Sequence, residues 1–490
     1  MTVDTESGAE PLDVLIVGAG LSGIGAAHRL QRDCPKKRFA LVEARDAIGG
    51  TWDLFRYPGV RSDSDMYTLG YDFKPWKHTK AIADGTTIRN YIREAADEAG
   101  ITRHIRFGCK VKRAEWASKD ALWTVTIEHQ GQESQLRTRF LYLCSGYYSY
   151  AAGHRPDFAG EADFHGPIVQ PQFWPQDLDY AGKRIVVIGS GATAVTLVPE
   201  LAKTAAHVTM LQRSPTYVVS LPSVDKVALV LRRCLPPGWA YWLARWKIVL
   251  IAAFYYRLAR SRPEMMKKKI VGMVADELRS PEAAATHFTP RYNPWDQRVC
   301  VVPDGDLFRS IREGRASVAT DTIDRFTTDG IRLNSGRELK ADIVVSATGL
   351  KVNQLGDIAV TVDGERVDVP KCMSYKGMML SGVPNFALAF GYTNASWTLK
   401  ADLTAGYVCR LLRYMDRRGL AVAMPRKEAD VQPQPFVNFT SGYVLRAEGV
   451  LPTQGSRKPW QVHQNYFADL LTIRWDRIAD RAMHFEAARP

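Results

Sequence analysis

The strongest constraint on the fold is a glycine-rich loop between a predicted strand and a predicted helix, an arrangement that occurs twice. The first copy has an apolar strand over 13–17, the loop Gly18-Ala19-Gly20-Leu21-Ser22-Gly23, a helix over 24–30 and a strand over 39–43. In such a loop Gly18 permits the tight turn, Gly20 lets the backbone approach a pyrophosphate, and Gly23 allows close helix–strand packing. The pattern predicts a βαβ unit that binds a dinucleotide at the helix N-terminus.

The residue expected to meet the ribose differs between the two copies. Glu43 ends the second strand of the first copy, where its carboxylate can accept hydrogen bonds from an unphosphorylated ribose, as in FAD or NAD. The second copy has a strand over 184–188, a helix to about residue 202 and a strand over 207–211, with Gly189, Gly191 and Ala194 in its loop. Arg213 follows, and its planar guanidinium can pair with a 2′-phosphate. We therefore predict one site for FAD and one for NADPH.

Length and element order predict an α/β protein with two Rossmann-like domains and an inserted helical region. The 490 residues exceed the roughly 250–300 at which a single core usually stops growing. We expect an FAD-binding domain (1–146 and 341–490), an NADPH-binding domain (147–220 and 289–340) and a helical insertion (221–288) that is interrupted at Pro236, Pro237 and Pro263. A segment rich in Pro, Gly and Ser, 431–460, should wrap the surface before a final helix over about 465–478.

The sequence lacks the usual motifs of several functional classes. Seven cysteines are scattered without a CxxC pair, which argues against a disulfide framework, a structural zinc site and a dithiol redox centre. The HExxH, GxSxG and P-loop motifs do not occur, and we predict no metal site. The first eleven residues are polar, and no apolar run approaches the ~20 residues that a membrane span needs. We therefore expect a cytoplasmic protein, with peripheral contact to a membrane surface as an open possibility.

Most of the net charge lies in one stretch of the sequence. The chain has 65 Lys and Arg against 52 Asp and Glu, a net charge of +13, and residues 226–269 hold eleven basic residues and one acid, hence +10. Aromatic residues are interspersed among these charges. Two interpretations stay open: a peripheral contact with an anionic membrane, or helices that cap an active site with aromatics in the core and charges in water. Nucleic acid is not expected, because no recognised binding module accompanies the charge.

A flavin reduced by NADPH needs an electron acceptor. Without a CxxC pair the chain lacks the acceptor of the disulfide reductases, so we expect the reduced flavin to react with O2 and give a flavin C4a-peroxide. Such chemistry requires a site that excludes water and holds a fixed positive charge. The sequence therefore predicts a flavin-dependent monooxygenase.

Residues 49–63 resemble the Baeyer–Villiger monooxygenase family. They read GGTWDLFRYPGVRSD and fit the family pattern (A/G)GxWxxxx(F/Y)P(G/M)xxxD in full. The central family motif FxGxxxFxGxxxHxxxWP is matched at Phe158, Gly160, Phe164, Gly166, Trp174 and Pro175. Gln170 occupies its histidine position, and His165, five residues earlier, is expected at the surface. Two further stretches, 291–298 and 391–400, resemble a mycobacterial branch of these class B flavin monooxygenases that activates thioamide prodrugs.

The resemblance implies roles for individual residues. Arg298 falls at the position of the family's active-site arginine, which would hold the negative charge of the peroxide and of its adduct, and Asp63 would orient it. Gln297 takes the place of a lysine that many relatives use for the 2′-phosphate, which leaves more of that contact to Arg213. Trp52 and Trp397, the latter at an expected helix start, belong to the implied FAD site.

The activity implied by the resemblance is the insertion of one O2-derived oxygen into small hydrophobic ketones to give esters or lactones, together with sulfoxidation. An N- or S-oxygenating flavin monooxygenase is the alternative. The complete motif over 49–63 and Trp174 favour the ketone reaction, and Gln170 leaves the alternative open. Glutamine can form hydrogen bonds but cannot change charge near neutral pH as histidine does. We expect Gln170 to affect domain movement and NADPH use rather than oxygen transfer. A third possibility, motivated by residues 226–269, is a membrane-bound or scaffolding NADPH-binding protein.

Overall fold

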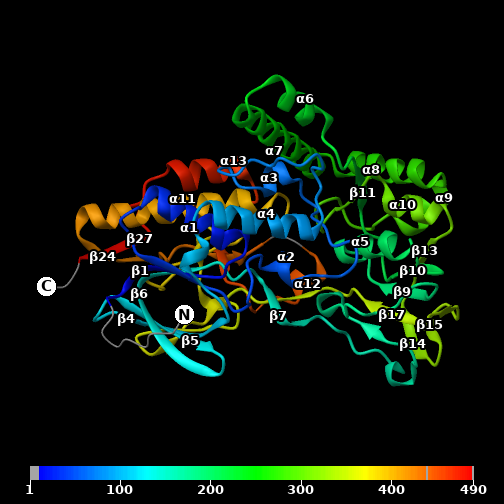
Figure 1. Cartoon of the computed structure of the whole chain (residues 1–490), viewed down its shortest axis with the longest axis horizontal. Coiled ribbons are helices and arrows are strands. Elements are labelled where there is room, and N and C mark those ends of the chain that lie inside the picture. Colours follow the sequence, from blue (N-terminus) through cyan, green and yellow to red (C-terminus); the bar gives the residue numbers. More distant parts are fainter. Residues whose placement is uncertain (1–9, 438–439, 448, 488–490) are drawn as a thin grey trace.

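Two α/β parts lie side by side in the computed structural model, which describes residues 10–437, 440–447 and 449–487 (Figure 1). The polar N-terminal segment lies outside the described residues up to residue 9. Each part has a sheet with parallel strands at its centre and helices packed beside it. The predicted α/β class, with two Rossmann-like units and an inserted helical region, is confirmed.

The first sheet has nine strands and is centred on the first glycine loop. β1 (Leu12–Val17) runs parallel to β2 (Phe39–Val42) and β6 (Gln132–Leu143). Its residues 14–17 are all apolar and buried, as expected for a strand that is covered on both faces. α1 (Leu21–Asp33) follows the loop and packs against α11 (Trp397–Arg418). The other strands are β20 (Glu365–Arg366), β19 (Ala359–Val362), β4 (Cys109–Ala117), β5 (Leu122–His129), β3 (Ile105–Arg106) and β23 (Phe386–Leu388).

The second sheet has five strands, all parallel, and contains the second glycine loop. β9 (Arg184–Ile188) lies between β10 (His207–Gln212) and β17 (Ile343–Ser346), and α5 (Ala192–Leu201) follows the loop. The neighbouring elements are β8 (Ile168–Val169), β13 (Ala316–Thr320), α10 (Asp306–Arg312), β11 (Val218–Leu221), β12 (Cys300–Pro303), β14 (Ile323–Thr327), β15 (Gly330–Leu333) and β16 (Glu338–Lys340).

The strand that follows the predicted boundary at residue 341 belongs to the second sheet. β17 follows this boundary but is hydrogen-bonded to β9 and β8, so it belongs to the second sheet. Its apolar sequence fits either sheet, because both accept a buried parallel strand. The chain returns to the first part through β18 (Leu350–Val352), which pairs antiparallel with β7 (Tyr148–Gly153). The two segments that connect the parts therefore run side by side.

The insertion forms the four helices α6 (Lys226–Cys234), α7 (Pro237–Ser261), α8 (Pro263–Leu278) and α9 (Pro281–His287). The predicted interruptions are confirmed, since Pro237 and Pro263 each begin a helix, where a missing N–H costs no hydrogen bond. α7 packs against the first part, where Arg245 donates hydrogen bonds to the carbonyl oxygens of Tyr67 (2.7 Å) and Gly70 (2.9 Å). No helix within the described residues is long and apolar enough to cross a membrane.

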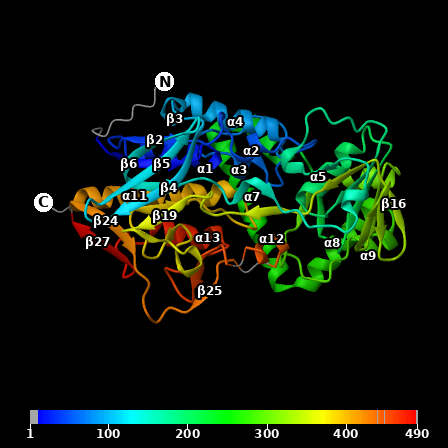
Figure 2. The same cartoon turned by 90° about the horizontal axis from the view of Figure 1, so that it is seen from below.

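The C-terminal segments gather on one side of the first part (orange and red in Figure 2). Segment 431–460 contains β25 (Pro433–Pro435), α12 (Gly442–Leu445) and β26 (Thr453–Gly455), and residues 438–439 and 448 of it lie outside the described residues. The predicted final helix is shorter than expected, because α13 (Tyr466–Asp469) passes into a π-helical turn that ends at Trp475. The remaining elements include α2 (Thr51–Leu54), α3 (Met66–Leu69), α4 (Gly85–Glu98), β21 (Ser374–Tyr375), β22 (Met379–Leu380), β24 (Leu420–Pro425) and β27 (Met483–Ala487).

Candidate active site

The first glycine loop is packed so closely that side chains are excluded from it. Gly18 has φ +106°, and a Cβ there would lie 2.5 Å from the carbonyl oxygen of Cys144. A Cβ at Gly23 would lie 1.8 Å from the carbonyl oxygen of Gly18. Gly20 is the N-cap of α1, and its Cα lies beside Gly50 of the neighbouring loop. The loop therefore presents bare backbone and the start of α1 to the space in front of it, which suits a pyrophosphate.

Glu43 lies at the end of β2, buried beside this loop. Its carboxylate accepts hydrogen bonds from the backbone N–H of Ala19 (2.7 Å) and of Arg45 (2.9 Å). Burial raises the pKa of Glu43, and the two N–H donors oppose that shift. Because a carboxylate has about four acceptor positions, two backbone donors leave room for ribose hydroxyls.

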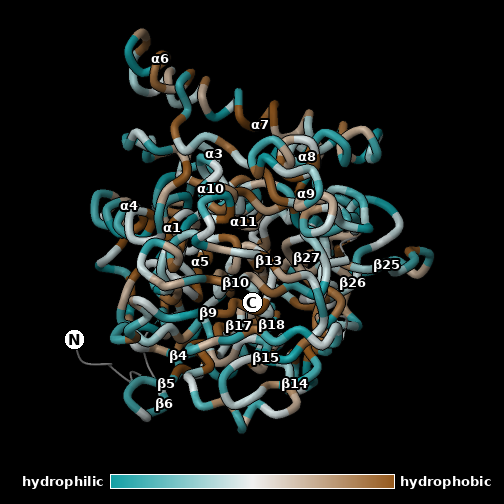
Figure 3. The backbone as a smooth tube through the Cα atoms, turned by 90° about the vertical axis from the view of Figure 1, so that its right-hand side faces the viewer, coloured by the Kyte–Doolittle hydropathy of each residue, from teal (hydrophilic) through white to brown (hydrophobic). Residues whose placement is uncertain are grey.

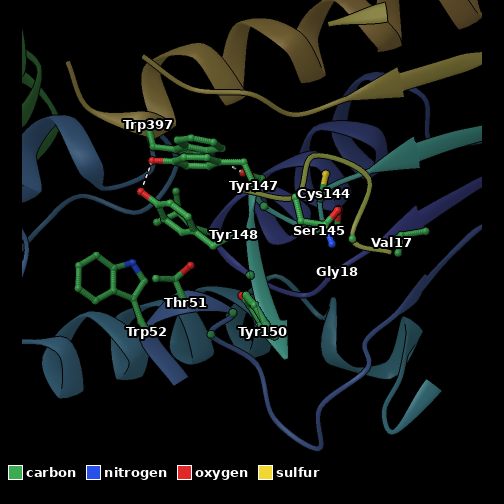
Figure 4. A pocket seen from close by; sticks show the side chains of 18 of the residues that line it. Val17, Gly18, Thr51, Trp52, Cys144, Ser145, Tyr147, Tyr148, Tyr150 and Trp397 are labelled. Carbon is green, nitrogen blue, oxygen red and sulfur yellow. Dashed lines mark hydrogen bonds between the residues drawn. The ribbon is translucent and has the colours of Figure 1, made fainter. Parts of the chain in front are cut away.

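A cavity of about 340 Å³ opens in front of the glycine loop (Figure 4). This volume lies within the range of small-molecule sites. The cavity brings together seven of the residues predicted from the sequence, namely Gly18, Gly20, Glu43, Trp52, Asp63, Arg298 and Trp397. Gly23, Gly189, Gly191, Ala194, Arg213 and Gln297 do not line it.

Arg298 and Asp63 form an ion pair at the wall of this cavity, with 2.5 Å between the guanidinium nitrogen and the carboxylate oxygen. The two side chains are 32% and 25% exposed. Arg298 comes from the segment just before β12, and Asp63 ends the motif over residues 49–63. A permanent positive charge is thus held at the cavity, partly withdrawn from water and oriented by one carboxylate.

The motif over residues 49–63 connects the two α/β parts. Four guanidinium groups surround its buried Asp53, those of Arg45 (2.8 Å), Arg56 (2.9 Å), Arg93 (3.5 Å) and Arg89 (3.6 Å). Tyr57 is buried in the core of the second part, and a Cβ at Gly59 would lie 3.1 Å from the carbonyl oxygen of Thr196 in α5. The motif thus packs on the second nucleotide unit and carries Trp52 and Asp63 to the cavity of the first.

Aromatic side chains form one wall of the cavity. The indole of Trp397 stacks on the ring of Tyr147, with ring centroids 4.9 Å apart and an angle of 8° between the planes. Its Nε1 donates a hydrogen bond to the Oγ of Ser22 (2.8 Å). The hydroxyls of Tyr147 and Tyr148 contact one another, as Figure 4 shows. Burial raises the pKa of Tyr147 well above its ordinary value, so its hydroxyl stays protonated.

The second glycine loop repeats the geometry of the first at a separate place. Gly189 has φ +134°, and a Cβ there would lie 2.4 Å from the carbonyl oxygen of Ala347, just as Gly18 meets Cys144. Gly191 is exposed at the N-cap of α5, and Ala194 is fully buried beneath it. Arg213 is exposed immediately after β10, and its contact with a 2′-phosphate stays a prediction.

Comparisons with known proteins now identify the family. Residues 60–366 match the family described as flavin-binding monooxygenase-like, and residues 16–83 match an NAD(P)-binding Rossmann-like domain. The chain is 56% identical over 483 residues to the FAD-containing monooxygenase EthA of Mycobacterium tuberculosis, a match that covers 98% of this chain and 99% of EthA. The chain belongs to the flavin-binding monooxygenase family. EthA of Mycolicibacterium smegmatis is 53% identical over 98% of both chains.

Solved structures of two monooxygenases share the fold of this flavin monooxygenase. A steroid monooxygenase bound to NADP has a TM-score of 0.75 at 20% identity and matches 98% of this chain and 100% of its own. OTEMO in complex with FAD and NADP has a TM-score of 0.70 at 23% identity, covering 85% of this chain and 88% of that chain. The predicted family and cofactors, FAD and NADPH, agree with these findings, whereas the reaction on ketones stays a prediction.

Sequence reasoning missed three tyrosines of the monooxygenase. Tyr147, Tyr148 and Tyr150 all line the cavity directly after the turn at Ser145 and Gly146. The available signal was a cluster of tyrosines directly after a strand and a glycine turn. Ligands in such folds bind at the carboxyl ends of parallel strands. Partial burial raises the pKa of Tyr150 to about 12.

Sequence reasoning also missed a buried ion pair behind the cavity. The Nζ of Lys400 on α11 lies 2.7 Å from the Oδ2 of Asp469, and the hydroxyl of Tyr392 donates a hydrogen bond to the same oxygen (2.6 Å). Burial lowers the pKa of Lys400, and Asp469 opposes that shift. Tyr392 lines the cavity, so this cluster fixes the segment that leads to Trp397 at the start of α11. Asp469 is remote in sequence, and no local pattern marks it.

Gln170 lies at the connection between the two parts. It precedes a short 3-10 turn over Pro171–Phe173, and its side-chain oxygen lies beside Gly153, at the end of β7. Gln172 donates a hydrogen bond to the carbonyl oxygen of Ser149 (2.8 Å). His165 is exposed, as expected. The position therefore suits an effect on how the parts are joined, and its influence on NADPH use stays a prediction.

Proposed function

We propose that this flavin monooxygenase uses NADPH and FAD to insert one oxygen atom of O2 into small ketones, giving esters or lactones, and that it also oxidises sulfides. The observation that carries the proposal is the Arg298–Asp63 pair in the wall of the cavity next to the first glycine loop. A fixed positive charge in a site partly withdrawn from water is what such a reaction requires.

The residues around the first cavity fit FAD. The glycine loop excludes side chains where a pyrophosphate would sit, and Glu43 retains free acceptor positions for a ribose. The Oγ of Ser145, which lines the cavity, is buried without a hydrogen-bond partner within the described part of the chain. A buried polar atom of this kind is expected to find its partner in a bound group.

The proposed mechanism assigns the following tasks to this chain's residues. A bound FAD that NADPH has reduced would supply the activation of O2. Arg298 would stabilise the negative charge that develops during oxygen transfer, because its guanidinium stays protonated throughout. Asp63 would hold the guanidinium in place and balance its charge. The stacked Trp397 and Tyr147 would exclude water. Burial raises the pKa of Tyr147, so its hydroxyl would stay neutral and could donate a hydrogen bond rather than a proton.

A second cavity, of about 220 Å³, is our candidate for the substrate chamber. Its wall includes Tyr256 and Arg260 of α7, Trp295, and Thr393 and Asn394. Residues 392–397 separate the two cavities, because Tyr392, Ala395 and Trp397 line the first while Thr393 and Asn394 line the second. This arrangement supports a small substrate that approaches the flavin past that loop.

We infer a domain division close to the predicted one. Residues 1–146 and 350–490 would bind FAD, and residues 147–220 and 289–346 would bind NADPH, with the insertion at 221–288 between the latter two. The change at 341 follows from the place of β17 in the second sheet.

A second candidate is an N- or S-oxygenating flavin monooxygenase, and Gln170 at the motif's histidine position favours it. Product analysis distinguishes the two. Purified, FAD-loaded enzyme with NADPH, 18O2 and a medium-chain methyl ketone is expected to yield an ester with one labelled oxygen. Hydrogen peroxide with unchanged ketone would contradict the ketone reaction. A labelled sulfoxide from a sulfide substrate would then support the second candidate.

Many relatives contact the 2′-phosphate with a lysine at the position that Gln297 occupies here. In this chain Arg446 is a candidate for that contact. A Cβ placed on Gly349 would lie 3.3 Å from the guanidinium of Arg446. Gly349 comes two residues after Ala347, whose carbonyl oxygen packs against Gly189 of the second glycine loop. Partial burial and the charge of Arg213 lower the pKa of Arg446. No ion pair involves either arginine within the described residues. Two such cations near the ribose side of the loop suit a 2′-phosphate.

We expect Arg213→Ala and Arg446→Ala each to weaken NADP+ binding about tenfold while NAD+ binding changes little, since a hydrogen bond to a charged group contributes about 1.5 kcal/mol or more. The dissociation constants of NADP+ and NAD+, measured by titration calorimetry, give this ratio without turnover. Arg332→Ala, an exposed arginine on β15, is the control. Equal losses for both nucleotides would remove Arg446 from the 2′-phosphate site.

A further inference from the structure

Helices α6 and α7 project from the rest of the molecule (Figure 1). Large apolar side chains are exposed on both helices. Trp239 is 64% exposed, Phe254 62% and Val230 57%. Other residues exposed on these two helices are Val227, Trp242, Leu250, Ile251 and Tyr255. Hydrophobic stretches mark α7 at the edge of the molecule in Figure 3. Single exposed apolar residues are ordinary, but a contiguous group of this kind indicates a contact surface.

These exposed side chains do not belong to the face of α7 that packs into the core. α7 has a distinct inner side, where Tyr241 is buried and donates a hydrogen bond to the carbonyl oxygen of Tyr71 (2.9 Å). The interpretation that the aromatics of this stretch form a core therefore holds for Tyr241 but not for Trp239 or Phe254. Trp239, Trp242, Trp246 and Phe467 form a chain of rings with centroids 6.1–6.2 Å apart, which extends the apolar surface toward α13.

Basic side chains occur on the same two helices and on the adjoining α8. Two of the eleven basic residues over 226–269 form ion pairs with carboxylates, Lys247 with Asp225 and Arg260 with Asp296. Arg233, Arg257 and Lys268 are exposed, and within the part of the chain that the structure describes no ion pair involves them. A surface with exposed tryptophans and uncompensated cations matches an anionic, interfacial environment, because indole rings favour the headgroup region and Lys and Arg favour anionic lipids.

We propose that the α6–α7 surface docks on a bilayer that contains anionic lipids. Exposed Trp239, Trp242 and Phe254 would enter the headgroup region, and the surrounding cations would lie against the lipid phosphates. The proposed contact is peripheral, with the rings entering the headgroup region without crossing the bilayer.

Docking would bring the candidate substrate chamber close to the lipid. α7 exposes Phe254 and Tyr255 on its outer side, and its neighbouring residues Tyr256 and Arg260 line the second cavity. An apolar substrate dissolved in the bilayer would then meet the protein beside this chamber. This consequence rests on the proposed function, whereas the docking itself does not.

Vesicle co-sedimentation tests the proposal without turnover. FAD-loaded protein is mixed with vesicles of phosphatidylcholine alone or with phosphatidylglycerol added, at low and at physiological salt. We expect binding to the anionic vesicles that weakens as salt rises, and little binding to phosphatidylcholine. Trp239→Ser, Trp242→Ser and Phe254→Ser combined should weaken binding at least about tenfold. Arg233→Ser, Arg257→Ser and Lys268→Ser combined should weaken it about a hundredfold, at roughly 1 kcal/mol per basic residue.

Phe173→Ser is the matched control, because Phe173 is exposed but lies outside α6 and α7. A blue shift of tryptophan emission on vesicle binding, lost in Trp239→Ser with Trp242→Ser, would support insertion of these rings. No sedimentation of the unchanged protein with anionic vesicles at low salt would overturn the proposal. A dimer in solution that the triple aromatic variant abolishes, without vesicle binding, would instead assign the surface to a second copy of the chain.

Discussion

Replacing Arg298 with alanine is expected to lower the rate of ester formation about 10²–10³-fold, the usual loss when one preorganised donor to a developing negative charge is removed. The guanidinium lies in the cavity wall and is held by Asp63 at 2.5 Å. Arg298→Lys keeps the charge but loses the planar fork, so we expect it to recover only part of the rate. The measurement is kcat and KM for the ketone, with labelled ester counted separately from NADPH consumed.

A role in chemistry predicts a fall in kcat with little change in FAD content, whereas a structural role predicts loss of bound FAD or of thermal stability. Arg332→Ala is the matched control, because Arg332 and Asp324 form an exposed pair 2.8 Å apart outside both cavities. If Arg298→Ala retained kcat to within threefold of the unchanged enzyme, the Arg298–Asp63 pair would serve the fold alone. Uncoupled NADPH oxidation with hydrogen peroxide as product would support the assigned role.

The local parts of the fold were predictable because their signals are local. A short apolar strand, a glycine loop and a helix follow one another without interruption, and the strand predicted over 184–188 has the observed bounds of β9. The prolines that begin α7 and α8 act through their own missing N–H groups. Such features depend on neighbours in sequence, which a pattern records.

Contacts between distant residues were predictable only through the family resemblance. Asp63 and Arg298 are joined across the two parts, and no spacing or composition relates them. No such resemblance indicated which sheet β17 joins or which residue pairs with Lys400. The predicted division at 341 therefore placed β17 with the first part, whereas the strand pairs in the second sheet. For residues 226–269 the sequence pattern predicted helices but did not indicate which aromatic side chains are exposed. That depends on the packing of α7 against residues 67–71 of the first part, which are remote in sequence.

Asp469→Ala is expected to destabilise the protein by about 3–5 kcal/mol, since it leaves the ammonium of Lys400 buried without a counter-charge. Both side chains are at most 3% exposed, and the Tyr392 hydroxyl would lose its acceptor as well. The free energy of unfolding in urea measures the loss. Asp416→Ala is the matched control, because Lys37 and Asp416 are also 2.7 Å apart but that carboxylate is 53% exposed, so a loss of at most about 1 kcal/mol is expected.

The destabilisation should shrink as pH rises. Burial holds the pKa of Lys400 below its ordinary value of 10.5, so the unfolded chain binds the proton more tightly than the folded one. Stability contributed by this site therefore increases with pH until the unfolded lysine is also neutral. Adding Lys400→Met to Asp469→Ala removes the buried charge and should recover much of the loss at neutral pH. A double variant as unstable as Asp469→Ala at every pH would mean that the Tyr392 hydrogen bond, rather than the lysine charge, accounts for the effect.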